Sequence, residues 1–115
     1  MIEYKKLEDC YEDIKGAALD TLERNKNKYE LPIDQAIAYY MNEMDGIFEE
    51  NELEKLVTLI IIGVFSVKYE YFNCKLMNEI KCAINEIESN KYDNLFNSGD
   101  KEGLLEDIIF IKQYI

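Results

Sequence analysis

The chain of 115 residues contains no histidine, only one proline and only five glycines. Without histidine it cannot build a Ser-His-Asp triad, an imidazole general base or a histidine-ligated metal site. The scattered glycines form no phosphate-binding loop of the GxGxxG or Walker type and no GxSxG nucleophile motif. Any catalysis would depend on carboxylates alone. We therefore expect a protein that is not an enzyme, with no catalytic residue and no cofactor.

Cysteine is also scarce. Cys10, Cys74 and Cys82 are the only three, and no two of them form a CxxC pair. An odd number without metal-ligand spacing is typical of a reducing compartment, so we expect a cytoplasmic protein without disulfides. Free cysteine is among the most often buried residue types. We therefore predict that all three cysteines pack into the core.

No apolar run is long enough to cross a membrane. The most apolar stretch, Leu56 to Val67, has 12 residues and is interrupted by Thr58, Gly63 and Ser66. Crossing a bilayer takes roughly 20 apolar residues, so the stretch is interpreted as a core helix. The first ten residues contain acids and no apolar segment, so we expect no secretory signal.

Basic residues are few. The chain has 13 Lys and Arg against 24 Asp and Glu, which gives a net charge of -11. Binding to DNA, RNA or an anionic membrane needs basic side chains opposite the phosphates, so neither nucleic acid nor membrane is an expected partner. A strongly acidic surface favours fast association with basic proteins. The expected partner is therefore a protein.

The acids are most crowded in the segment NEMDGIFEENELE, residues 42–54, which contains six carboxylates and no Lys or Arg. Like charges in one segment repel one another and lower the stability of the compact state. Such a segment can be no more than a solvated helix end and turn; the sharper alternative is a docking surface for a basic partner. The candidate partner-binding residues are Glu43, Asp45, Glu49, Glu50, Glu52 and Glu54, with Asp9, Glu12 and Asp13 as a second acidic face.

Two metal-site interpretations of the carboxylates are unfavourable. A di-metal site in a helical bundle requires ExxH pairs, which a chain without histidine lacks. An EF-hand-like alignment of residues 41–52 places Gly46 at the sixth position and Glu52 at the twelfth. Met41 at the first position, however, offers no oxygen ligand. We therefore expect no metal site.

Apolar residues recur at spacings of three and four along most of the chain, a pattern typical of amphipathic helices. The spacing predicts helices over residues 3–24, 32–48, 52–71 and 74–88, and a last helix that begins near residue 100. The third of these is apolar on most of its circumference, which places it at the centre of a bundle.

Three polar residues stand where helix caps are expected. The side-chain oxygens of Asn51, Asn73 and Asp100 are placed to accept the first free N–H groups of the third, fourth and last helices. No segment shows strand alternation, and no linker divides the chain. The fold prediction is an all-α bundle of about five helices around the apolar third helix, in a single domain of residues 1–115.

Several segments resemble a known family when they are taken in order. They are YEDIKGA near the start, DQAIAYYMNEM in the second predicted helix, ELEKLVTLIIIGVFSVKY in the third, and INEIESNKYDNLF followed by GLLEDIIFIKQY towards the end. Together they are similar to an all-helical immunity-protein family of bacterial polymorphic-toxin systems, the one numbered three in the immunity series. The resemblance covers most of the chain.

What the resemblance implies is a small cytoplasmic immunity protein that binds a cognate toxin with a basic surface and blocks it. Many such toxins are nucleases, whose clefts must be basic to hold phosphates. A helical adaptor, or a DNA-mimicking regulator that binds a basic protein, is the alternative from another class. A carboxylate metal enzyme is a third option, and it predicts that divalent ions raise the thermal stability.

Overall fold

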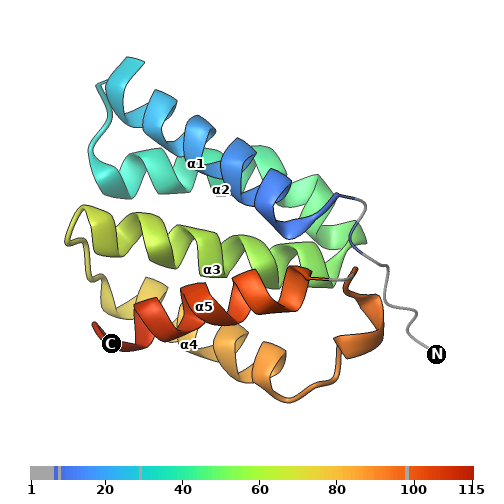
Figure 1. Ribbon diagram of the computed structural model, residues 1–115. Coiled ribbons are helices and arrows are strands. Elements are labelled where there is room, and N and C mark those ends of the chain that lie inside the picture. The colour runs from blue at the N-terminus through green and yellow to red at the C-terminus, as the bar shows by residue number, and fades with distance from the viewer. Residues whose placement is uncertain (1–6, 8, 29, 98) are drawn as a thin grey trace.

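The computed structural model describes residues 7, 9–28, 30–97 and 99–115, which form five α-helices and one short 3-10 helix (Figure 1). In chain order these are α1 (Tyr11–Lys28), α2 (Ile33–Glu50), α3 (Glu52–Lys68), α4 (Cys74–Glu88), η1 (Asp93–Leu95) and α5 (Asp100–Lys112). No strand occurs in these described ranges, so the all-α prediction is confirmed. None of the described helices is both long and apolar enough to span a membrane.

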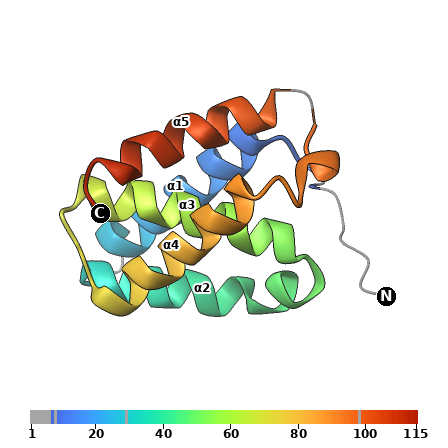
Figure 2. The ribbon, with the colours of Figure 1, turned by 90° about the horizontal axis from the view of Figure 1, so that it is seen from below.

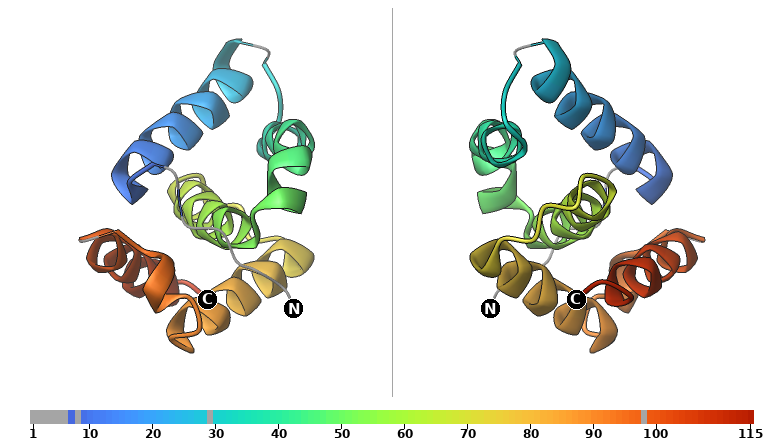
Figure 3. Two further views of the ribbon diagram at one scale, coloured as in Figure 1. Left: turned by 90° about the vertical axis from the view of Figure 1, so that its right-hand side faces the viewer. Right: turned by 90° about the vertical axis from the view of Figure 1, so that its left-hand side faces the viewer.

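The helix α3 lies between the other four α-helices, as Figure 3 shows, and packs against each of them. Its buried residues lie on nearly every side of the helix: Leu53, Leu56, Val57, Thr58, Leu59, Ile60, Ile61, Ile62, Gly63, Phe65, Ser66 and Val67. Removing so much apolar surface from water is the main driving force for the fold. The prediction of a central apolar third helix is confirmed.

Two of the three predicted caps are confirmed. Asn51, the one residue between α2 and α3, accepts the N–H of Glu54 at 3.1 Å, and Asn73 accepts the N–H of Leu76 at 3.0 Å. The prediction for Asp100 is wrong, because its side chain caps a different helix. Its Oδ1 accepts the N–H of Tyr11, the first residue of α1, at 3.0 Å.

Some helix boundaries differ from the predicted ones. Residues 1–6 and 8 lie outside the described part, and α1 begins only at Tyr11, not near residue 3. The helix α3 ends at Lys68, whereas the sequence predicted an end at Tyr71. Glu70 has a φ of +54°, and the N–H of Tyr71 returns to the carbonyl of Ser66 at 2.9 Å. A left-handed residue that closes the last turn in this way ends an α-helix.

The prediction that the cysteines are buried is wrong. Cys10, Cys74 and Cys82 are all exposed free thiols. Cys82 lies on the side of α4 opposite Ile80 and Ile84, because successive residues of a helix are rotated by about 100°. The large isoleucines occupy the inward face and leave Cys82 outside.

Candidate functional site

The side of α3 that α1 and α5 cover is closed by polar links between these two helices. Besides the bond between Asp100 and the Tyr11 N–H, the Tyr11 hydroxyl donates to Asp107 at 2.5 Å, and the Lys15 ammonium lies 3.0 Å from the same carboxylate. Burial, followed by this hydrogen bond and the negative charge of Asp107, raises the pKa of Tyr11 well above its ordinary value. The phenol therefore stays a donor.

The opposite side of α3 is open. The helices α2 and α4 each pack on α3, but the pair α2 and α4 is not among the closely packed helix pairs of the described residues. Figure 2 shows α2 and α5 at opposite edges of the bundle, and Figure 3 shows α2 and α4 standing apart. Between them lies a groove of about 1420 Å³, which we call the α2–α4 groove.

The α2–α4 groove has an apolar floor and an acidic rim. Its apolar lining includes Ile37, Met41, Phe48, Leu56, Leu59 and Leu76. Its charged lining consists of seven carboxylates and three lysines: Asp34, Asp45, Glu49, Glu50, Glu52, Glu79 and Glu86, with Lys55, Lys75 and Lys91. The wall formed by α2 is the more acidic one, because no Lys or Arg occurs between Ile33 and Glu50.

A second, smaller depression of about 250 Å³ lies on the other side of α2. Its lining includes four carboxylates, those of Asp9, Asp13, Glu43 and Glu54, together with Tyr40. Burial, together with the negative charges of Glu54 and then Glu43, raises the pKa of Tyr40 to about 12. We call this the α1–α2 depression.

The candidate residues from the sequence are therefore divided between these two places. Asp45, Glu49, Glu50 and Glu52 line the α2–α4 groove, whereas Glu43, Glu54, Asp9 and Asp13 line the α1–α2 depression. Glu12 belongs to neither: it lies against α5, where its Oε1 would be 2.8 Å from a Cβ placed on Gly103. The 100° rotation per residue explains the division, because residues 43 and 45 point to opposite sides of one helix.

Two glutamates of the groove occupy an unfavourable place. The helix α2 ends at Glu50, so Glu49 and Glu50 lie in its last turn, which has no basic residue. The carboxyl end of a helix carries partial negative charge, and an acid there costs stability. Glu52 and Glu54 lie in the first turn of α3, where the dipole favours acids. Only the second pair has a local structural reason.

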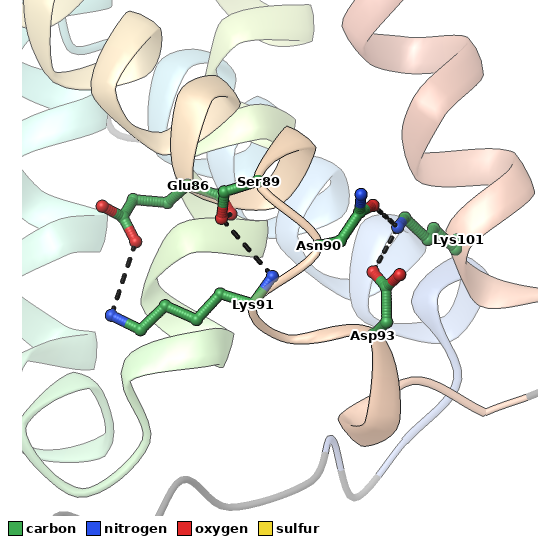
Figure 4. A network of polar contacts seen from close by, with 6 residues as sticks. All are labelled: Glu86, Ser89, Asn90, Lys91, Asp93 and Lys101. Carbon is green, nitrogen blue, oxygen red and sulfur yellow. Dashed lines mark hydrogen bonds and ion pairs between the residues drawn. The ribbon is translucent and has the colours of Figure 1, made fainter.

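One end of the groove is fixed by the segment after α4, which Figure 4 shows. The Glu86 carboxylate lies 3.8 Å from the Lys91 ammonium at the rim. Lys101 of α5 donates to Asn90 at 2.8 Å and also pairs with Asp93. These contacts tie the segment to α5, so the rim at this end does not depend on α2.

The α4 wall of the groove was not foreseen from the sequence. Glu79, Cys82 and Glu86 are spaced along α4 and form part of its polar face, which by itself is typical of any amphipathic helix. No group of three or more Cys, Asp or Glu among the described residues is placed to hold a metal ion.

Comparison of the chain with protein-family models, curated proteins and solved structures gives no match.

Proposed function

We propose that this protein is an immunity protein that neutralises a cognate toxin by binding it, with no catalytic step. The observation that carries the proposal is the position of Glu49 and Glu50. Both are exposed, both line an open groove, and both stand at the helix end where the dipole disfavours them. Carboxylates that lower the stability of their own helix are typical of residues retained for a partner.

The mechanism is competition for a basic surface. A toxin that cleaves nucleic acid needs a basic cleft, because its substrate carries one negative charge per phosphate. The net charge of -11 attracts such a protein over distances near the Debye length, about 8 Å at physiological salt. Once bound, the carboxylates of α2 occupy the sites of the phosphates. The family resemblance described above supports the same function.

The test is co-expression with the protein encoded next to this gene. We expect the neighbouring protein to be toxic alone, to be neutralised by this chain, and to co-purify with it in a 1:1 complex. The charge-reversed variant E49K/E50K should neutralise less well although it folds. Absence of both binding and neutralisation would refute the proposal.

A DNA-mimicking inhibitor is the second candidate, and one observation favours it. The carboxylates of α2 lie on both sides of the helix, so α2 carries two acidic surfaces, as the two phosphate backbones of duplex DNA do. A DNA mimic would displace duplex DNA from a DNA-binding protein, and reversal of either acidic surface would weaken it. If binding to the partner is weakened by reversal of only one acidic surface, the immunity function is favoured over DNA mimicry.

A further inference from the structure

We propose that the α2–α4 groove receives one basic amphipathic helix of the partner, with the apolar face of that helix on α3 and its Lys and Arg side chains against α2. The inference rests on the proposed function, because it assigns a place and a chemistry to the partner of that same acidic surface. It selects the groove and leaves the α1–α2 depression outside the main contact.

The shape of the bundle leaves room for one more helix. On the closed side, α1 and α5 pack against each other as well as on α3. On the open side, α2 and α4 both pack on α3 but leave a groove of about 1420 Å³ between them. Helices pack at interaxial distances of about 8–10 Å. A helix placed on α3 between them would give the open side the contacts that the closed side already has.

The floor of the groove is suited to an apolar helix face. Ile37, Phe48, Leu56 and Leu59 line it but are buried, with 5–6% of their surface accessible, whereas Met41 and Leu76 of the same lining are partly exposed. A helix-in-groove contact of this kind uses apolar anchors below and charged pairs along the edges. An apolar floor alone would not identify the chemistry of the occupant, but the charge of the rim does.

The charge of the rim requires a basic occupant. The rim contains seven carboxylates and only three lysines. One of these lysines, Lys91, already lies 3.8 Å from Glu86. The α2 wall has no basic residue, so the cationic edge of the incoming helix must lie along α2. A second copy of this chain does not fit, because it brings the same net charge of -11. Nucleic acid is excluded by the same repulsion.

The probe is a synthetic peptide of about 18 residues, made of Leu and Lys at helical spacing, which would span the 15 residues of α4 at about 1.5 Å per residue. A peptide with Glu in place of every Lys is its control. The readout is alkylation of Cys82, an exposed thiol that lines the groove, compared with Cys10, an exposed thiol outside it. Mass spectrometry measures both rates in one sample of the native chain.

We expect the basic peptide to slow alkylation of Cys82 roughly tenfold at saturation, leave Cys10 unchanged, and bind more weakly as salt is added. The acidic peptide should protect neither thiol. Unchanged alkylation of Cys82, or equal slowing at both thiols, would overturn the proposal.

Two matched variants separate the groove from general attraction to an acidic protein. D45K/E49K reverses two carboxylates of the groove, and D13K/E43K reverses two carboxylates of the α1–α2 depression, with the same change in net charge. We expect the first to weaken peptide binding roughly tenfold and the second to weaken it less than threefold. Equal weakening would show that only net charge matters and would overturn the groove.

The same two variants, tested with the neighbouring gene product, keep the two proposals distinct. If the chain neutralises that protein but D45K/E49K does so undiminished, the immunity function stands and the groove is wrong. If the peptide protects Cys82 but no neighbouring protein is neutralised, the groove stands and the immunity function is wrong.

Discussion

On the side of α3 that α1 and α5 cover, carboxylates bind groups of the protein itself, whereas the carboxylates of α2 on the other side form no ion pair within the part of the chain that the structure describes. Asp100 and Asp107 accept hydrogen bonds from Tyr11, and Asp107 also pairs with Lys15. Among the described residues, no ion pair involves Asp45, Glu49 or any other acid of α2. One chain thus uses the same chemical group in two ways.

The difference between the two sets of carboxylates follows from their burial. A buried carboxylate is tolerated when hydrogen bonds or a cation replace the lost water. Asp107 has both, from Tyr11 and Lys15, whereas Asp100 has the one hydrogen bond from the Tyr11 N–H and its Oδ2 has no partner among the described residues. An exposed carboxylate keeps its water and can give it up to an incoming cation. The carboxylates of the closed side thus contribute to stability, and those of the open side stay in water, where the proposed partner would reach them.

The largest expected effect comes from deleting apolar side chains on the two sides. Leu104 of α5 is completely buried, so L104A should lower the free energy of unfolding by about 2–5 kcal/mol. Leu56 lines the groove and is 6% exposed, so the space left by L56A opens to solvent and the loss should be smaller, about 1–3 kcal/mol. Urea unfolding of both variants measures the difference. Equal losses would mean that the groove floor is packed as tightly as the α1–α5 side.

A smaller effect is expected when the cap that crosses the closed side is removed. D100A leaves the Tyr11 N–H without its acceptor in a buried place, which should cost about 1–3 kcal/mol. N73A removes an exposed local cap and should cost about 0.5–1 kcal/mol. D100N keeps an acceptor oxygen and should recover most of the loss. If D100N is as unstable as D100A, the hydrogen bond to Tyr11 is not the reason.

The three predicted caps also show which parts of the fold the sequence could predict. Asn51 and Asn73 were predicted correctly, because a cap joins groups three residues apart and depends on local geometry alone. Asp100 was assigned to the wrong helix, because its acceptor role depends on Tyr11, 89 residues away in the chain. Helix existence follows from local periodicity, whereas contacts between helices depend on how the helices are arranged in space.

The candidate site shows the same limit. The acids of residues 42–54 were identified from their crowding, but their division between two places depends on where α1 and α4 lie relative to α2. The exposed cysteines were missed for another reason. The tendency of cysteine to be buried is an average over proteins, whereas in α4 the isoleucines already fill the inward face.

A third prediction compares two glutamates on either side of Asn51. Glu50 ends α2 and Glu52 begins α3, and both line the groove. E50Q removes a charge that the helix dipole disfavours and should raise stability by about 0.3–1 kcal/mol, while E52Q removes a favoured charge and should lower it by a similar amount. Thermal unfolding at low salt measures both. If both substitutions stabilise the protein, general charge repulsion and not the dipole controls this end of the groove.

The smallest expected effect concerns a partly exposed carboxylate that is paired with a lysine. Glu23 of α1 lies 2.7 Å from the ammonium of Lys68, and it accepts a hydrogen bond from the Tyr69 hydroxyl at the end of α3. Burial alone would raise the pKa of Glu23, but the hydrogen bonds from Lys68 and Tyr69, with the charges of Lys68 and Lys26, hold it below its ordinary value of 4.5.

A carboxylate whose pKa is lower in the folded state stabilises the protein above the unfolded pKa, and this stability is lost as the pH falls through the folded value. The wild-type free energy of unfolding should therefore decrease as the pH is lowered from 5 to below the folded pKa of Glu23. The E23Q variant should lose less over that interval. Glu23 is about a quarter exposed, so screening by water should keep the difference well under about 1 kcal/mol. K68M, which removes the principal partner, should flatten the profile in the same direction. Parallel profiles for wild type and E23Q would mean that this carboxylate, although paired, is no more tied to folding than the unpaired acids of α2.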